Sequence, residues 1–398
     1  MIHNTKMRIG IDCRIIGLKN AGIGRYVDRL VEGLLSKDSA NEYVLITRAD
    51  EPISHATACH TVNNKASCKL VQVNIPHYSL KEQLLLPSLV KSLKVDFMHY
   101  PNFNTPILSN IPYVITIHDL IKHSSRGKET TTKQGWLYWF KYLGYHAGFY
   151  LSVKRAKKII VPTKAVKSEL EKFYSLPPEK VVVTYEGVDD KFAINQPFAD
   201  LLVKSTMKKY AIVKPYLLYV GAVYPHKNIE RLIDAVKIIN QQPLTQLQLV
   251  VVCGRSIFWE RLAKKVVDKK AEGCVNLVGF APDEDLKVLY NQARAFVFPT
   301  LAEGFGLPGL EAMAASTPVI CSNISVLKEV YGDCAVYFDP LSVDDMAEKI
   351  TSVLSDENLR FSVISKSNKL YPRYQWSKMV EETLKVYDEV GASLRSGN

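Results

Sequence analysis

The segment from residue 296 to residue 320 holds the side chains best suited to chemistry, two carboxylates around a glycine-rich turn. Glu303 stands before the glycines, and Glu311 follows it after seven intervening residues. Glycines let a backbone approach a bound group, and a helix that begins near Leu307 would turn free N–H groups towards an anion. A carboxylate accepts hydrogen bonds from two neighbouring hydroxyls. This pattern predicts a site for a ligand with phosphates and many hydroxyls, such as a nucleotide sugar.

The glycines of this turn, Gly304, Gly306 and Gly309, also match the spacing of a dinucleotide-binding fingerprint. That fingerprint requires an acidic residue about 20 positions later, at the end of the next strand. The next expected strand ends at Cys321 and Ser322, and neither is acidic. The sequence therefore disfavours a nicotinamide cofactor, while glycines that serve only tight packing remain an alternative.

The elements that must position these residues follow from the alternation of short apolar runs with amphipathic segments, which predicts an α/β fold with parallel sheets. Strands are expected at 7–11, 43–46, 70–73, 95–99, 113–117, 158–161, 181–185, 215–220, 247–252, 275–277, 295–299 and 318–320. We predict two Rossmann-like, doubly wound domains, an acceptor-binding domain at 1–195 and a donor-binding domain at 205–375, which face a cleft. The segment 376–398 is expected to form a helix that closes back.

Composition limits what the chain can be. Its 398 residues are 47% hydrophobic and 23% charged, as in ordinary globular proteins, and no apolar run is long enough to span a membrane. The N-terminus has no secretory pattern. Seven cysteines without CxxC spacing favour buried thiols and the cytoplasm over a zinc site. A net charge of +11 favours an anionic partner.

Several segments resemble glycosyltransferase family 4, whose members are retaining enzymes with the GT-B fold. Glu303 and Glu311 match the E-x7-E signature of that family, within the sequence FVFPTLAEGFGLPGLEAMAASTPVI. Other similar segments are 21–26, an N-terminal glycine loop, 96–101, 116–120, 219–229 and 333–340, a late loop. The resemblance covers nearly the whole chain and leans towards the mannosyltransferase-like branch.

The resemblance implies a role for each matching residue of the second domain. Glu311 would hold the ribose hydroxyls of the donor, and Glu303 would contact hydroxyls of its sugar. Lys227 would contact the pyrophosphate and stabilise the leaving phosphate. The other donor-binding positions are the loop and a strand-ending glycine: Gly304, Phe305, Gly306, Leu307 and Gly221.

In the first domain, the resemblance places His118 over the donor sugar as a third catalytic residue. Gly22 and Gly24 would let the first loop approach the pyrophosphate or the acceptor, next to Arg25 and Asp119. Members of the family retain the configuration of the sugar without a metal, and the leaving phosphate assists deprotonation of the acceptor. We accordingly expect no cofactor and no metal.

One departure from the family pattern concerns the charge on the phosphates. Many relatives carry an arginine directly after the strand-ending glycine, where this chain has Ala222. His226, where an arginine is common, and Arg255 are the candidates for the missing positive charge. Ser316 replaces a usual glycine, and we expect that change to be harmless.

Residues 121–160 are unusually basic and aromatic, with nine Lys or Arg, one acid and eight aromatic side chains. A core helix with solvated flanks is the simpler interpretation. The alternative is an element that lies on an anionic membrane surface, since Trp and Tyr favour the lipid interface and cations favour its headgroups.

Together these features predict a retaining hexosyltransferase that moves a sugar, first of all mannose from GDP-mannose, to a lipid-linked or polysaccharide acceptor. We expect it in the cytoplasm, or peripheral on the inner face of the membrane. A UDP-sugar is the alternative donor. A sugar-nucleotide epimerase or dehydrogenase and a non-catalytic basic binder are weaker alternatives, and no nucleic-acid motif accompanies the charge.

Overall fold

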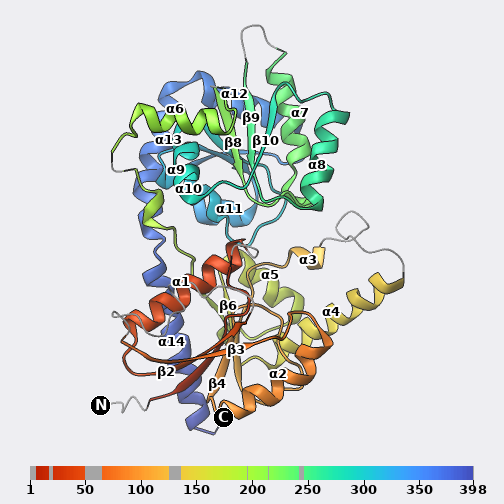
Figure 1. Ribbon diagram of the computed structural model, residues 1–398, viewed down its shortest axis with the longest axis vertical. Helices are drawn as coiled ribbons and strands as arrows, with labels where there is room; N and C mark the ends of the chain where they lie inside the picture. Colours follow the sequence, from red (N-terminus) through yellow and green to blue (C-terminus); the bar gives the residue numbers. More distant parts are fainter. Residues whose placement is uncertain are drawn as a thin grey trace. The chain divides into compact units, whose positions relative to one another are not determined.

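The computed structural model describes residues 6–17, 21–49, 65–124, 136–194, 196–213, 215–241 and 246–397. These residues form two compact units (Figure 1). Unit 1 consists of the described residues within 1–120, 132–187 and 376–398. Unit 2 consists of those within 121–131 and 188–375. The C-terminal helix therefore belongs to the unit that contains the N-terminal strand.

Unit 1 is built on a parallel sheet with the strand order β3-β2-β1-β4-β5-β6-β7 in the described part of the chain. The strands are β1 (Arg8–Asp12), β2 (Glu42–Arg48), β3 (Ser67–Val73), β4 (Phe97–Tyr100), β5 (Tyr113–Thr116), β6 (Lys158–Val161) and β7 (Val181–Val183). Most are buried along nearly their whole length, because helices cover both faces of the sheet. β3 lies at one edge, and its side chains are accordingly half-exposed or exposed.

The helices of unit 1 are α1 (Ala21–Lys37), α2 (Leu80–Ser92), α4 (Trp136–Arg155), α5 (Lys164–Tyr174) and α14 (Trp376–Arg395). Figure 1 shows α1 and α14 together on one side of the sheet, with α2, α4 and α5 on the other. Leu30 and Leu34 of α1 pack with Tyr387 and Val390 of α14 in one buried core with β1. The closing helix predicted from the C-terminal sequence thus completes one face of unit 1.

Unit 2 is built on a second parallel sheet, with the order β10-β9-β8-β11-β12-β13 among the described strands. Its strands are β8 (Tyr216–Val220), β9 (Gln248–Val252), β10 (Val275–Gly279), β11 (Ala295–Phe298), β12 (Val319–Ser322) and β13 (Ala335–Phe338). Its helices are α3 (Ile121–Ser124), α6 (Asp200–Lys209), α7 (Ile229–Ile239), α8 (Ile257–Asp268), α9 (Asp283–Gln292), α10 (Leu307–Ala314), α11 (Ser325–Tyr331), α12 (Val343–Ser355) and α13 (Glu357–Leu370). The predicted α/β architecture of two doubly wound units is confirmed.

Two local expectations were wrong. The segment 333–340 is more than a loop, because Ala335–Phe338 pairs with β12 as the edge strand β13. Cys68 on β3 is disulfide-bonded, whereas the sequence favoured thiols throughout; Cys13, Cys253 and Cys321 are free and buried. Within the described residues, no helix is long and apolar enough to cross a membrane.

Candidate active site

The candidate site of unit 2 lies at the carboxyl edge of its sheet, where β8 and β11 are neighbours. From β8 the chain continues to β9 on one side, whereas β11 lies on the other side, so the strand order reverses between them. Open parallel sheets bind ligands at such a switch point. The loops that leave these two strands carry Lys227 and Glu303, two of the three predicted catalytic residues.

Lys227 and Glu303 meet across the switch point in an ion pair between Nζ and Oε1. Their side chains keep 14% and 10% of their surface exposed, so solvent still reaches the pair. The Lys227 Nζ also lies 5.4 Å from the ring centroid of Phe298, the last residue of β11. An anionic ligand at this edge would compete with Glu303 for the ammonium group.

Asn228 joins three loops of the site, and the sequence analysis assigned it no role. Its backbone has the left-handed conformation, with φ of 59°, between the short 3-10 turn Pro225–Lys227 and α7. Asparagine tolerates this conformation better than most residues. Its Nδ2 donates to the carbonyl oxygens of Pro299 at 3.0 Å and Pro340 at 2.8 Å. Asn228 therefore fixes the loop of Lys227 against the loop of Glu303.

Glu311 lies on α10, the helix that follows the Glu303 loop, and it is buried. The hydroxyl of Tyr290, on α9, donates to its Oε2 at 3.1 Å. This contact holds the carboxylate in place, and no sequence pattern indicates it because the two residues lie on different helices. Glu303 and Glu311 thus differ: one pairs with a lysine at the edge, and the other is anchored within α10.

The glycines of the turn are required by packing on one tyrosine. Gly306 has a φ of +97° and precedes α10, and its carbonyl accepts a hydrogen bond from the Tyr331 hydroxyl. A Cβ on Gly306 would lie 2.5 Å from that hydroxyl oxygen, and a Cβ on Gly309 would lie 2.2 Å from it. The packing interpretation of the glycines therefore applies to both positions. At the start of α10, Pro308 has no N–H and the Gly309 N–H donates to the Gly306 carbonyl oxygen at 3.1 Å, so neither residue offers a backbone donor to an anion.

The remaining loop residues, Gly304, Phe305 and Leu307, are buried. The ring of Phe305 packs edge-on against Tyr374, with centroids 5.6 Å apart. The side chains of this stretch therefore hold the loop, and its backbone is the part suited to contact a ligand.

Ala222 stands where many relatives carry an arginine, and the loop after β8 holds His226, one of the two candidates to replace its charge. Burial and the neighbouring charge of Lys227 lower the pKa of His226 to about 4, so its ring is neutral near pH 7. The ring stacks on Tyr224, with centroids 5.7 Å apart. Arg255 is exposed and lies over the ring of Trp259 at 5.6 Å. Of the two candidates for a second positive charge, Arg255 is the one that is charged.

Gly221 ends β8 with a φ of +137°, which explains a glycine at the turn into this loop. A Cβ there would come within 3.4 Å of the Tyr219 hydroxyl, a close but tolerable distance. That hydroxyl donates to the carbonyl of Ala222 at 2.6 Å. The backbone conformation, more than the available space, selects glycine at this position.

In unit 1, the third predicted catalytic residue, His118, follows β5 and has both ring nitrogens engaged. Nδ1 lies 3.2 Å from Oε1 of Glu186, and Nε2 lies 3.1 Å from the carbonyl oxygen of Pro101. The ring of Tyr26, on α1, meets it edge to face with centroids 4.7 Å apart. Asp119 follows, half-buried. Glu186 has no role in the sequence analysis, and the contact joins residues 68 positions apart.

Gly22 and Gly24 lie in the first turn of α1, where a loop was expected, and Arg25 beside them is half-buried. A Cβ on Gly24 would lie 2.7 Å from the carbonyl oxygen of Gly17, so this position requires glycine. A Cβ on Gly22 would meet nothing within 4 Å. The close approach that Gly24 allows is therefore to the chain's own backbone.

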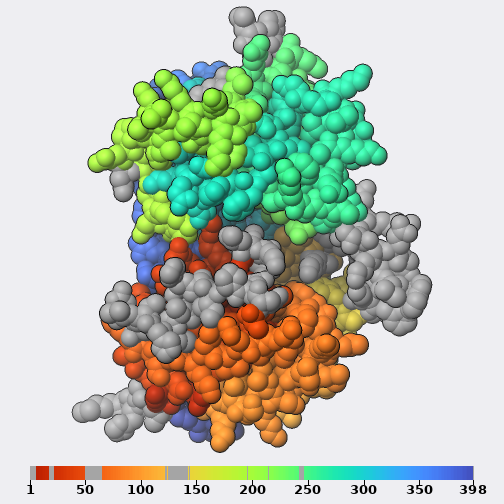
Figure 2. Space-filling model, viewed as in Figure 1, coloured from red at the N-terminus to blue at the C-terminus, as the bar shows by residue number. Residues whose placement is uncertain are grey.

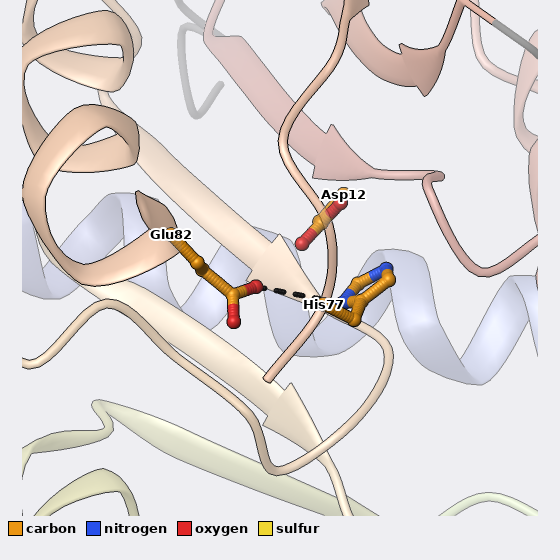
Figure 3. Close-up of side chains that lie close together, drawn as sticks. All are labelled: Asp12, His77 and Glu82. Carbon is orange, nitrogen blue, oxygen red and sulfur yellow. Dashed lines mark ion pairs between the residues drawn. The ribbon is translucent and has the colours of Figure 1, made fainter. Parts of the chain in front are cut away.

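A buried charged cluster that sequence reasoning missed lies at the end of β1 (Figure 3). One ligand atom each of Asp12, His77 and Glu82 lies within 4.8 Å of the other two, close enough to share a cation. Arg14 already supplies that cation, because its Nη2 lies 2.6 Å from both Asp12 Oδ2 and Glu82 Oε1. The chemistry of this donor set therefore favours a structural cluster over a metal centre.

The hydrogen bonds of this cluster join four separate segments of unit 1. The Ser79 hydroxyl caps α2 by accepting from the Glu82 N–H at 3.1 Å, and Glu82 accepts from Asn104 at 2.6 Å. Arg14 also donates to the carbonyl of Ile75 at 3.0 Å. Burial would raise the pKa of Glu82, but His77, Arg14 and Asn104 together lower it below its usual value. The charged forms are thus stabilised inside the fold.

Comparison with known proteins bears directly on these two sites. Residues 20–192 match the family model described as Glycosyltransferase Family 4, and residues 204–370 match the model described as Glycosyl transferases group 1. Between them the two models cover His118 and the Lys227–Glu303 pair, whereas Asp12 and Arg14 lie outside both. The chain is thus similar to glycosyltransferase family 4 over the residues of the first model and to glycosyltransferases group 1 over those of the second, which contain the E-x7-E segment.

Two curated mannosyltransferases are similar to about three fifths of the chain. O-antigen chain mannosyltransferase B of Escherichia coli is 31% identical over 237 residues, 59% of this chain and 61% of that protein. O-antigen chain mannosyltransferase RfbU of Salmonella typhimurium is 34% identical over 229 residues, 58% of this chain and 59% of that protein. The chain thus matches about three fifths of the length of these relatives.

Solved structures share the fold along almost the entire chain. Sucrose-phosphate synthase from Thermosynechococcus elongatus aligns with a TM-score of 0.76 at 20% identity, covering 98% of this chain and 100% of that one. Anabaena HepE in complex with UDP-glucose aligns with a TM-score of 0.70 at 16% identity, covering 97% and 100%. These similarities identify the GT-B fold.

Proposed function

We propose that this chain is a retaining glycosyltransferase that takes a hexose from a nucleoside-diphosphate sugar without a metal ion. The observation that carries the proposal is the Lys227–Glu303 pair at the switch point of unit 2, with Glu311 anchored on the adjoining helix. One cation and two carboxylates at the edge of a parallel sheet match a ligand that has a diphosphate and two sets of hydroxyls.

Each side chain then has a separate task. Lys227 leaves Glu303 for the diphosphate and stabilises the negative charge that develops on the leaving group. Glu303, released from the lysine, accepts hydrogen bonds from hydroxyls of the transferred sugar. Glu311, oriented by Tyr290, accepts from the ribose hydroxyls. Arg255 favours the phosphates, and neutral His226 offers one N–H donor.

GDP-mannose is the donor we favour, and a growing polysaccharide or lipid-linked saccharide is the acceptor. The names of the two curated relatives, both O-antigen chain mannosyltransferases, support this choice. A UDP-sugar is the second candidate, because the similar fold of HepE holds UDP-glucose. An enzyme that acts at the inner face of the membrane would meet such an acceptor there.

A thermal-shift series tests the proposal. The full-length protein is heated with GDP, UDP, ADP, GDP-mannose, UDP-glucose, UDP-N-acetylglucosamine or NAD, each with and without a chelator. A ligand at about 100 times its dissociation constant adds about 2.7 kcal/mol of stability, which is a resolvable shift. We expect GDP and GDP-mannose to raise the melting temperature equally with and without chelator. A shift with NAD alone, or with none of the ligands, would refute a nucleotide-sugar enzyme.

We also propose that unit 1 rests on an anionic membrane surface. On α2, whose orange surface is part of Figure 2, Leu80, Leu84 and Leu85 are exposed beside Lys81. Exposed Leu108 lies on the adjoining loop, which both α2 and α4 contact through Gln83 and Arg155. Leucines next to lysines suit the boundary of an anionic bilayer.

The segment 121–160 contributes less to that surface than its composition suggests. Lys122 and most of residues 124–141 are outside the described side chains. Further along α4, Phe149 is buried and stacks with Tyr174, as the simpler core-helix interpretation predicts, and Tyr150 and Leu151 remain exposed. Flotation with anionic and with neutral vesicles tests the surface: Leu84→Gln with Leu85→Gln should reduce binding to anionic vesicles. Equal flotation of variant and parent would refute a role for α2.

A further inference from the structure

Two histidines of unit 1 lie beside carboxylates, and they differ in what the second ring nitrogen meets. His118 lies between Glu186 Oε1 at 3.2 Å and the Pro101 carbonyl oxygen at 3.1 Å. His77 lies 3.4 Å from Glu82, but its Nε2 is buried without a hydrogen-bond partner among the described residues. Glu82, moreover, is already bound by Arg14. Only the first pair surrounds its imidazole with acceptors on both sides.

The donors and acceptors around the His118 ring bear on its protonation state. A carbonyl oxygen only accepts, and an ionised carboxylate only accepts. A neutral imidazole donates from one nitrogen and presents a lone pair at the other, so one of its two contacts would be repulsive. The imidazolium ion donates from both nitrogens and satisfies both contacts. Both contacts of His118 are therefore favourable when the ring is protonated and Glu186 is ionised.

We propose that Glu186 is a positioning residue that holds His118 as an imidazolium in one fixed orientation at the carboxyl edge of the unit 1 sheet. This inference rests on the proposed function in one respect, the presence of His118 in the active site. Both side chains are mostly enclosed, with 12% of His118 and 10% of Glu186 exposed. Solvent reaches this pair only in part, as it does the Lys227–Glu303 pair, and a carboxylate acts more strongly on its neighbour in such a partly enclosed place than in bulk water.

The other titratable groups around the ring agree with a single fixed charge. From β4, burial lowers the pKa of His99 to about 3, with a smaller contribution from the neighbouring His118. His99 is held neutral by Tyr387 at 2.6 Å and Thr116 at 2.9 Å. From α1, Tyr26 meets the ring with its edge. Asp119 is the next residue in the chain, so Glu186 is the carboxylate in direct contact.

This arrangement gives His118 a specific task. With both N–H groups engaged, the ring has no free nitrogen for proton transfer to or from a substrate. It contributes instead a permanent positive charge at the carboxyl edge of the unit 1 sheet, where it can stabilise negative charge that develops during transfer. Glu186 acts through His118 and does not itself contact substrate.

Histidine side-chain NMR of the full-length, 15N-histidine-labelled protein tests the inference without any substrate. His118→Asn assigns the signals of the ring. At pH 7.0 both His118 nitrogens of the parent protein should carry protons, whereas Glu186→Gln should leave one of them unprotonated. Glu381→Gln, which removes an exposed acid of α14 in the same unit, is the matched control and should leave the ring protonated. A singly protonated His118 in the parent, or a doubly protonated ring in Glu186→Gln, would overturn the proposal.

Transfer assays provide the second measurement. Glu186→Gln should lower kcat about tenfold at pH 8 and recover at pH 6, where solution protons restore the imidazolium, and Glu186→Asp should restore part of the rate at pH 8. A loss independent of pH would indicate a merely structural role. If no nucleotide sugar binds the protein at all, the proposed function fails, while the NMR result still decides the state of His118.

Discussion

Asp12 ends β1 in unit 1, and Lys227 follows β8 in unit 2; both strands lie where the strand order of their sheet reverses. Each residue belongs to a charged cluster, but the two clusters differ in how far the protein encloses their side chains. Arg14, Asp12 and Glu82 have side-chain exposures between 0% and 4%, and hydrogen bonds surround them. Lys227 and Glu303 have their own contact at an edge that solvent reaches.

The difference shows that position in the fold does not by itself identify a binding site. In unit 1 the charges at the switch point are satisfied by the protein, and they join β1, the loop before α2, α2 and the 102–104 loop. In unit 2 the described contacts of Lys227 are Glu303 and the ring of Phe298, so an anionic ligand can replace its one carboxylate partner. Charge in the first cluster serves stability, and charge in the second is available for ligand binding.

The largest effect on stability is expected from Arg14→Met, which leaves two buried carboxylates without a cation. Loss of one partner of a buried pair costs about 3–5 kcal/mol. Urea unfolding should show that loss, and nucleotide affinity of the folded fraction should not change. Arg14→Lys, which keeps the charge but not the fork geometry, should lie in between and keeps the test informative if Arg14→Met fails to fold. A loss below about 0.5 kcal/mol would contradict a stabilising cluster.

The same cluster predicts a dependence on pH. Folding lowers the pKa of Asp12 and Glu82. A lowered pKa contributes stability above the ordinary carboxyl range, and this contribution disappears as pH falls through the folded value. The parent protein should therefore lose stability below about pH 4 more steeply than Arg14→Met, in which Arg14 no longer lowers either pKa. Parallel curves of unfolding free energy against pH would argue against this linkage.

Lys227→Ala tests the partly exposed cluster of unit 2 and should lower the rate of transfer. Removal of one group that stabilises transition-state charge costs about 2.7–4 kcal/mol, or roughly 100- to 1,000-fold in kcat. Unfolding free energy should fall less than in Arg14→Met, because solvent reaches Glu303 and can hydrate the carboxylate left behind. Lys265→Ala, an exposed lysine of α8 that pairs with Glu230, is the matched control. Full activity of Lys227→Ala would remove the lysine from the mechanism.

Glu311→Ala sharpens the account of the donor. Loss of hydrogen bonds to a charged group costs about 1.5–3 kcal/mol, so nucleotide affinity should fall roughly 10- to 100-fold in calorimetry. Tyr290→Phe, which removes the hydroxyl that orients Glu311, should cost about 1 kcal/mol. Glu260→Ala, an exposed carboxylate of the same unit, should have no effect. Unchanged affinity in Glu311→Ala would place the ribose elsewhere.

The smallest effects should separate two neighbouring glycines of α1. Gly24→Ala puts a Cβ 2.7 Å from the backbone of Gly17 and should destabilise unit 1 by about 1 kcal/mol or more. Gly22→Ala meets nothing and should be neutral or stabilising by about 0.5–1 kcal/mol, as for glycine in a helix. Thermal unfolding of the two variants compares them directly. Equal melting temperatures would show that the close approach at Gly24 relaxes without cost.

The sequence was sufficient for features that depend on neighbouring residues. The strands, the start of α10 and the Glu303–Glu311 spacing are local, and periodicity and glycines predict them. The contacts of His118 with Glu186 and of Asp12 with Glu82 depend on which strands lie side by side, and no local pattern records the sheet order. Tyr290 and Tyr331 were missed for the same reason, because their hydroxyls act on a helix and a loop distant in sequence.

Amide hydrogen exchange of the full-length protein with and without GDP-mannose is the most direct test of the contrast between the two switch points. Bound donor should slow exchange in residues 221–228 and 300–311, which form the open cluster of unit 2. The closed cluster of unit 1, at residues 75–104, should exchange at the same rate in both states. Protection confined to residues 75–104, or no protection in either unit, would contradict the assignment of the donor to the Lys227–Glu303 edge.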